Sequence, residues 1–75
     1  MSAKESFAER LRALRNAKQL TLKEFSKEIG RPPQSINNWE MAGSSPSLET
    51  LWQLADYFDV SMDYLMGRSD DPKRR

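Results

Sequence analysis

The sequence predicts an all-α fold, a compact bundle of five helices within one small domain. Three observations predict it. With 75 residues, of which 37% are hydrophobic, the chain can fill one modest core. It has no cysteine, so no disulfide can stabilise so small a fold, and local packing of helices is the simplest remaining solution. Signals for strands are weak, because β-branched residues are few and no Asn-Gly or Asp-Gly hairpin turn occurs.

The first expected helix follows Ser2, which has the spacing of a capping box with Glu5. Phe7, Leu11 and Leu14 recur at helical intervals, with charged residues between them. The pattern predicts an amphipathic helix with one buried face.

The second expected helix follows Thr21, which has the same capping-box spacing with Glu24. Phe25 and Ile29 lie on its apolar face. Gly30 comes directly afterwards, where a left-handed residue ends a helix, so the second helix is expected to stop there.

The third expected helix starts at Pro33, because proline is well tolerated as the first helical residue, and runs to about Met41. At roughly 100° per residue, Ile36 and Trp39 share one apolar sector, which makes Trp39 a structural core residue. The opposite, exposed sector contains Gln34, Asn37, Asn38 and Met41.

A fourth, longer helix and a short fifth one complete the domain. Ser47 is the expected cap of the fourth, and its apolar stripe consists of Leu48, Leu51, Leu54, Ala55 and Phe58. Ser61 is expected to cap a fifth helix that runs through Leu65 and is closed by Gly67. The domain is therefore expected to span residues 1–67.

Charge is unevenly distributed, although the formal net charge is only +1. Residues 1–38 carry eight positive and four negative side chains, whereas residues 39–67 carry five negative and none positive. Residues 68–75 carry four positive and two negative side chains. A basic half against an acidic half is typical of anion binding on one face. The same pattern fits ordinary solvated helix surfaces, so both interpretations stay open.

Composition argues against an enzyme, a metal site and a membrane protein. The chain has no histidine and no cysteine, so it lacks the commonest general base, the commonest zinc ligand and a thiol nucleophile. Its three glycines form no phosphate loop. No long apolar run occurs, so neither a signal peptide nor a membrane span is expected, and a cytoplasmic location is the default. We expect no cofactor and no small-molecule ligand.

The exposed face of the third helix carries amides but no Lys or Arg. Each amide side chain offers a donor and an acceptor side by side, an arrangement that pairs with N6 and N7 of adenine in the major groove. Taken alone, such a face also fits an ordinary polar surface. Here it belongs to the second of two short helices joined by a tight turn at Gly30, and this is the helix-turn-helix layout.

Residues 7–67 resemble the phage repressor and Cro type of helix-turn-helix domain. The matching motifs, in the family's order, are Phe7-x-Glu9-Arg10-Leu11-Arg12-x-Leu14-Arg15, Leu20-Thr21-x-x-Glu24-Phe25, Gly30, Gln34-Ser35-Ile36-x-x-Trp39-Glu40, Pro46-Ser47-Leu48-Glu49-Thr50-Leu51, Leu54-Ala55 and Val60-Ser61-x-Asp63-x-Leu65. The resemblance implies a lambda-repressor-like fold that binds double-stranded DNA sequence-specifically. It also implies a homodimer on a palindromic operator and transcriptional control, with repression by occlusion of a promoter.

The resemblance also implies roles for single residues. Gln34 and Asn38 match base-reading positions, and Asn37 shares their exposed face. Arg15 and Glu40 match a pair that bridges the first helix and the recognition helix, either to orient the recognition helix or as a plain structural ion pair. The backbone N–H groups of Gln34 and Ser35 are candidates for a phosphate contact. Contacts to the DNA backbone are further expected from Arg10, Thr21, Lys23, Lys27, Arg31, Ser35 and Met41.

The chain departs from the family pattern at several positions. Leu22 stands where Gln often opens the second helix, Pro33 replaces a polar residue, and Gln19 occupies a turn position that is often Gly. The loop Ala42–Pro46 has no Lys or Arg. Because each lost phosphate contact lowers the log–log salt slope by about 0.9, we expect modest electrostatic affinity for DNA.

Two functions of different classes remain under consideration. The first is the DNA-binding regulator. The alternative is a protein-interaction module of the same fold, such as an antirepressor or antitoxin subunit, which the uncharged recognition helix favours. A dimer interface would be marked by whichever of these residues are exposed: Trp52, Tyr57, Met62, Tyr64 and Met66. Residues 68–75 are expected to be a flexible, polar and basic tail, with contact to DNA phosphates or a linker role as other interpretations.

Overall fold

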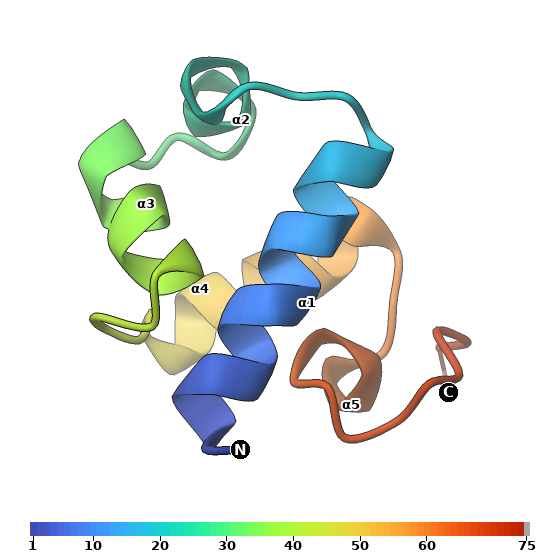
Figure 1. Ribbon diagram of the computed structural model, residues 1–75. Helices are drawn as coiled ribbons and strands as arrows, with labels where there is room; N and C mark the ends of the chain where they lie inside the picture. Colours follow the sequence, from blue (N-terminus) through green and yellow to red (C-terminus); the bar gives the residue numbers. More distant parts are fainter. Residues whose placement is uncertain (75) are drawn as a thin grey trace.

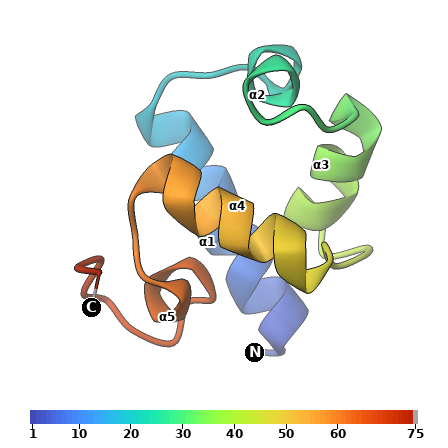
Figure 2. The same cartoon turned by 180° about the vertical axis from the view of Figure 1, so that it is seen from behind.

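Residues 1–74, which the computed structural model describes, form five helices and no strand. The helices are α1 (Ala3–Ala17), α2 (Leu22–Ile29), α3 (Pro33–Glu40), α4 (Leu48–Phe58) and α5 (Met62–Leu65). Helix α1 runs through the middle of the molecule, with α3 on one side and α5 on the other (Figure 1). Seen from behind, α4 lies across the opposite face of α1 (Figure 2). The prediction of a five-helix, all-α fold is confirmed.

The helices begin where their capping residues predict. Ser2 accepts from Glu5 N at 3.2 Å while Ser2 N donates to the Glu5 carboxylate at 2.9 Å, and Thr21 and Glu24 repeat this box at 3.0 and 2.8 Å. The hydrogen bonds from the capping residues, those of their backbone N–H groups foremost, lower the pKa values of Glu5 and Glu24. Helix α3 differs, because its cap is Pro32 and no side chain satisfies its first N–H groups.

Left-handed residues end or connect several helices. Gly30 closes α2 at φ 68°, a conformation that glycine adopts without steric cost. Gln19, in the turn between α1 and α2, takes φ 58° although it carries a side chain. This conformation explains why glycine suits that position in the family.

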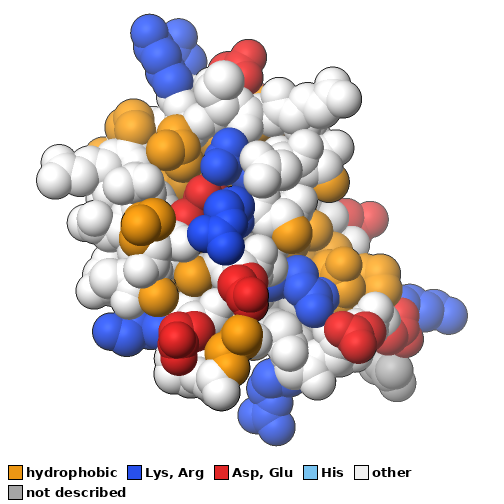
Figure 3. Space-filling view, in the orientation of Figure 1, with side chains coloured by type: hydrophobic (Ala, Val, Ile, Leu, Met, Phe, Trp, Pro, Cys, Tyr) orange, Lys and Arg blue, Asp and Glu red, His pale blue; other side chains and the backbone are white. Residues whose placement is uncertain are grey.

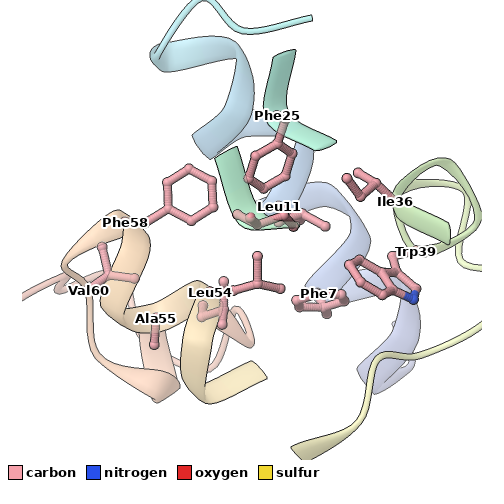
Figure 4. Packing of buried hydrophobic residues seen from close by; sticks show 11 residues of the cluster. Phe7, Leu11, Phe25, Ile36, Trp39, Leu54, Ala55, Phe58 and Val60 are labelled. Atoms are coloured by element: carbon pink, nitrogen blue, oxygen red, sulfur yellow. The ribbon is translucent and has the colours of Figure 1, made fainter. Parts of the chain in front are cut away.

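The core lies where α1 to α5 converge (Figure 4). Its centre contains side chains with no exposed surface: Leu11, Phe25, Ile36, Leu54 and Leu65. Trp39 is 7% exposed and packs in the same cluster, as the helical spacing predicts. Burial of Ile36 and Trp39 fixes which side of α3 faces outward, so the core positions the candidate site.

The prediction for the first turn of α4 is wrong at Leu48. Leu48 was expected in the buried stripe but is 71% exposed, whereas Thr50 is 4% exposed. At roughly 100° per residue, Leu48 lies about 100° from the direction midway between Leu54 and Phe58, and Thr50 only about 60°. The buried face of α4 is therefore centred away from Leu48.

The segment after α5 lies against the body of the protein. Pro72 O accepts a hydrogen bond from Ser61 N at 3.0 Å, and Arg74 forms ion pairs with Asp56 at 2.5 Å and Asp59 at 3.4 Å. Composition alone predicts a flexible tail, but residues 68–74 have these defined contacts; Arg75 lies outside the described residues. The ion pairs are exposed, so they contribute little to stability. No helix within residues 1–74 has the length and apolar character needed to cross a membrane.

Candidate functional site

Helix α3 presents a polar, uncharged surface to solvent. Gln34, Asn37 and Asn38 are exposed, and Met41 directly after the helix is 70% exposed. Ile36 and Trp39 on the other side are buried. The structure thus brings the three amides predicted to read bases together on one accessible face.

The N-terminal end of α3 offers fewer free donors than expected. Ser35 N donates to Pro32 O at 3.1 Å, and Ile36 N donates to the same oxygen at 3.3 Å. Ser35 N–H is therefore already used, which corrects its assignment as a phosphate donor. Gln34 N–H has no acceptor within residues 1–74 and keeps that capacity.

Several predicted backbone-contacting residues lie on and after α2. Lys23 and Lys27 are exposed, and Thr21 is exposed at the cap of α2. Arg31 is also exposed, but its guanidinium donates to the Gln53 side chain on α4 at 3.3 Å. This long and exposed hydrogen bond exchanges readily with other partners, so Arg31 can turn toward a phosphate.

The structure places Arg10 away from α3. Its guanidinium lies 3.8 Å from the centroid of the Tyr64 ring and donates to Ser69 O and Asp70, both at 3.4 Å. Tyr64 belongs to α5, which lies on the other side of α1 from α3 (Figure 1). Arg10 is therefore not brought together with the other residues expected to contact DNA.

A buried ion pair joins α1 to the end of α3. Arg15 Nε and Nη2 donate to the two carboxylate oxygens of Glu40 at 2.7 and 2.9 Å, and Arg15 Nη1 donates to Leu20 O at 2.7 Å. The side chains are only 13% and 5% exposed. The hydrogen bonds to Glu40 raise the pKa of Arg15. The pair holds α3 against α1 and against the turn before α2.

Arg12 has a role that the sequence did not predict. Its Nη1 donates to Glu40 O at 3.2 Å, so a second arginine of α1 reaches the last residue of α3. The spacing of the two arginines could have predicted this contact, because Arg12 stands three residues before Arg15 and residues three apart share a helix face. Lys and Arg side chains lie in the middle of the face on which α1 and α3 are side by side (Figure 3).

The exposed apolar residues on α4 form a small patch. Leu48 and Trp52, one helical turn apart, are 71% and 65% exposed. The other candidates for a dimer interface are half-buried and pack against the core: Tyr57, Met62, Tyr64 and Met66. Among the five aromatic and methionine residues proposed from the sequence, Trp52 alone is largely exposed.

Two short helices joined through a left-handed glycine, with the second exposing its polar face over a buried tryptophan, define a helix-turn-helix domain. Residues 11–65 match the family model described as helix-turn-helix. The chain belongs to this family, in its Cro/C1-type branch, whose members are DNA-binding transcriptional regulators.

Curated relatives carry the same description. The chain is similar to the uncharacterized HTH-type transcriptional regulator YobD of Bacillus subtilis, with 39% identity over 88% of this chain and 59% of the relative. It is also similar to ImmR of Bacillus subtilis, an HTH-type transcriptional regulator, with 29% identity over 92% of this chain and 54% of the relative. A third relative is the HTH-type transcriptional activator BcrR of Enterococcus faecalis, at 30% identity over 80% of this chain and 29% of the relative. The chain thus spans little more than half the length of the first two, and no solved structure matches it significantly.

Proposed function

We propose that the chain is a sequence-specific repressor that binds a palindromic operator in double-stranded DNA as a homodimer. The observation that carries the proposal is the exposed amide face of α3, formed by Gln34, Asn37 and Asn38. Each of these side chains offers a donor and an acceptor that match an adenine edge. Helix α3 has eight residues and is about 12 Å long, comparable to the width of the major groove.

Contacts to the phosphates would hold α3 in register. In this proposal the base-reading amides come from α3, and the backbone contacts come mainly from α2, from the turn after it and from both ends of α3. Phosphates would be contacted by Thr21, Lys23, Lys27, Arg31 and the Ser35 hydroxyl, with Gln34 N–H as a main-chain donor. Met41 has no donor in its side chain and its N–H already donates to Asn37 O at 2.9 Å, so it would touch the DNA backbone only at the apolar part of a sugar. Arg10 is left out, because its guanidinium lies against α5.

The homodimer is supported by size and by the apolar patch on α4. Helix-turn-helix dimers bind half-sites about 34 Å apart, one turn of the double helix. The domain has extents of 29 × 23 × 22 Å, so two copies at that spacing with their longest axes in line would leave a gap of about 5 Å, which facing side chains can bridge. Leu48 and Trp52 would gain from such contact, because it removes exposed apolar surface from water.

Selection from random duplex oligonucleotides at low salt tests the proposal, with Gln34→Ala as the control. Enrichment of a palindrome by the parent, and loss of that enrichment in the variant, would support DNA binding, base reading and two-fold symmetry together. Recovery of no common sequence would refute specific binding. If in addition no duplex bound at low salt while a purified protein partner did, the protein-interaction module would be favoured, with the uncharged outer face of α3 turned to that partner.

The direction of control needs its own measurement, since one relative is named an activator. A reporter gene with the selected site placed over its promoter should lose expression when the protein is produced. Increased expression would contradict repression and leave DNA binding standing.

A further inference from the structure

Cationic side chains are missing from the region around the C-terminal end of α3. No Lys or Arg occurs between Arg31 and Arg68, so neither the last turn of α3 nor the loop Ala42–Pro46 carries a positive charge. Lys27 and Arg31 flank the turn that leads into the opposite, N-terminal end of α3. A DNA strand beside the C-terminal end would need a cation from another part of the chain.

Helix α1 supplies two arginines to this end of α3. Arg12 Nη1 donates to Glu40 O at 3.2 Å, and Arg15 pairs with the Glu40 carboxylate at 2.7 and 2.9 Å. The carbonyl oxygens of Asn37, Asn38 and Trp39 accept hydrogen bonds from backbone N–H groups of the turn that follows α3. The next carbonyl along the chain, that of Glu40, accepts its hydrogen bond from Arg12. Arg12 therefore lies at the very end of α3.

The two arginines differ in the charge they leave available. Arg15 is 13% exposed and bound to both oxygens of a carboxylate, so its charge is neutralised. Arg12 is exposed and donates to a neutral carbonyl oxygen, and within residues 1–74 no carboxylate pairs with it. A guanidinium has five N–H groups, so four remain for another acceptor.

We propose that Arg12 binds a DNA phosphate at the C-terminal end of α3 and takes over the role that a charged loop would have. The inference rests on the proposed function. With α3 about 12 Å long, Arg12 at one end and Lys27 and Arg31 at the other can face phosphates on opposite walls of the groove. The hydrogen bond to Glu40 O holds the guanidinium in place before DNA arrives, which lowers the ordering cost of the contact.

Salt dependence separates a phosphate contact from a purely structural role. Binding of the palindromic duplex recovered by selection is measured between 50 and 200 mM salt for the parent, Arg12→Gln and Arg12→Lys. Because the homodimer carries the substitution in both protomers, for Arg12→Gln we expect the log–log slope to fall by about 1.8, about 0.9 for each lost contact, so the affinity ratio of parent to variant shrinks about 12-fold over this range. Arg12→Lys keeps the charge and should retain the parent slope. Lys73→Gln is the matched control, since it removes one charge from the segment after α5, on the far side of α1 from α3 (Figures 1 and 2), and should also retain it.

Each outcome bears on the inference. If Arg12 only caps α3, Arg12→Gln weakens binding by the same factor at every salt concentration with an unchanged slope, and that result overturns the inference while the proposed function stands. A lowered slope in Lys73→Gln equal to that in Arg12→Gln would also overturn it. If the parent binds no duplex at all, the proposed function fails and the inference with it. Thermal unfolding of each variant confirms that the comparison is made on folded protein.

Discussion

Replacing Arg15 by Met should destabilise the fold more than most single changes on the surface. The substitution keeps much of the side-chain volume but removes the cation that pairs with Glu40 through bonds of 2.7 and 2.9 Å. Glu40 is 5% exposed, so its carboxylate would be left buried without its partner. Loss of one partner from a buried pair typically costs about 3–5 kcal/mol.

That loss is large for a chain of this size. A domain of 75 residues has a free energy of unfolding of about 4–11 kcal/mol, so the variant should retain at most about three quarters of it and, toward the lower end of that range, should unfold near room temperature. Urea denaturation followed by circular dichroism at 222 nm measures the change, because the regular secondary structure within residues 1–74 consists of helices alone.

The double variant Arg15→Met, Glu40→Leu provides the decisive comparison. Removing both charges leaves no unpaired carboxylate, so the double variant should be more stable than Arg15→Met alone. If Arg15→Met loses less than about 1 kcal/mol, or if the two single effects simply add, the buried pair is not coupled and the reasoning is refuted.

Three further outcomes are expected. Gln34→Ala and Asn38→Ala should each weaken binding of the selected duplex by about 1–3 kcal/mol per half-site in a fluorescence titration, and unchanged binding would remove their base-reading role. Glu24→Gln should reduce stability above pH 4.5, because the lowered pKa of Glu24 means that its charged form stabilises the fold. This contribution is lost as the pH falls through the lowered pKa, so the stabilities of parent and variant should converge in acid. Unfolding curves measured at several pH values test this, and a constant difference in stability would contradict it. Gly67→Ala should cost more than about 1 kcal/mol in thermal unfolding, since Gly67 has φ 76° and an added Cβ would lie 2.0 Å from Ser6 Oγ; a melting temperature equal to that of the parent would refute the clash.

Local features of the chain were predictable from sequence because their interactions span few residues. The boxes at Ser2 and Thr21 join residues three apart, and Gly30 needs only its own backbone freedom to end α2. The helical period was equally readable, since Ile36 and Trp39 define the buried side of α3 by spacing alone. With those residues inside, the amides had to lie outside.

The sequence therefore determined the five helices, their caps and the outward face of α3, all of which follow from spacing within a few residues. The sequence did not determine the roles of residues whose partners are distant along the chain. Arg10 and Arg12 are the same residue type and stand two positions apart in the sequence. Arg10 nevertheless contacts Ser69, 59 residues away, whereas Arg12 contacts Glu40, 28 residues away. Which arginine faces α3 was decided by how α1 packs between α3 and α5. In the same way, the packing direction of α4 left Leu48 outside and Thr50 inside. A periodic pattern defines a face, but only the assembled helices define what that face meets.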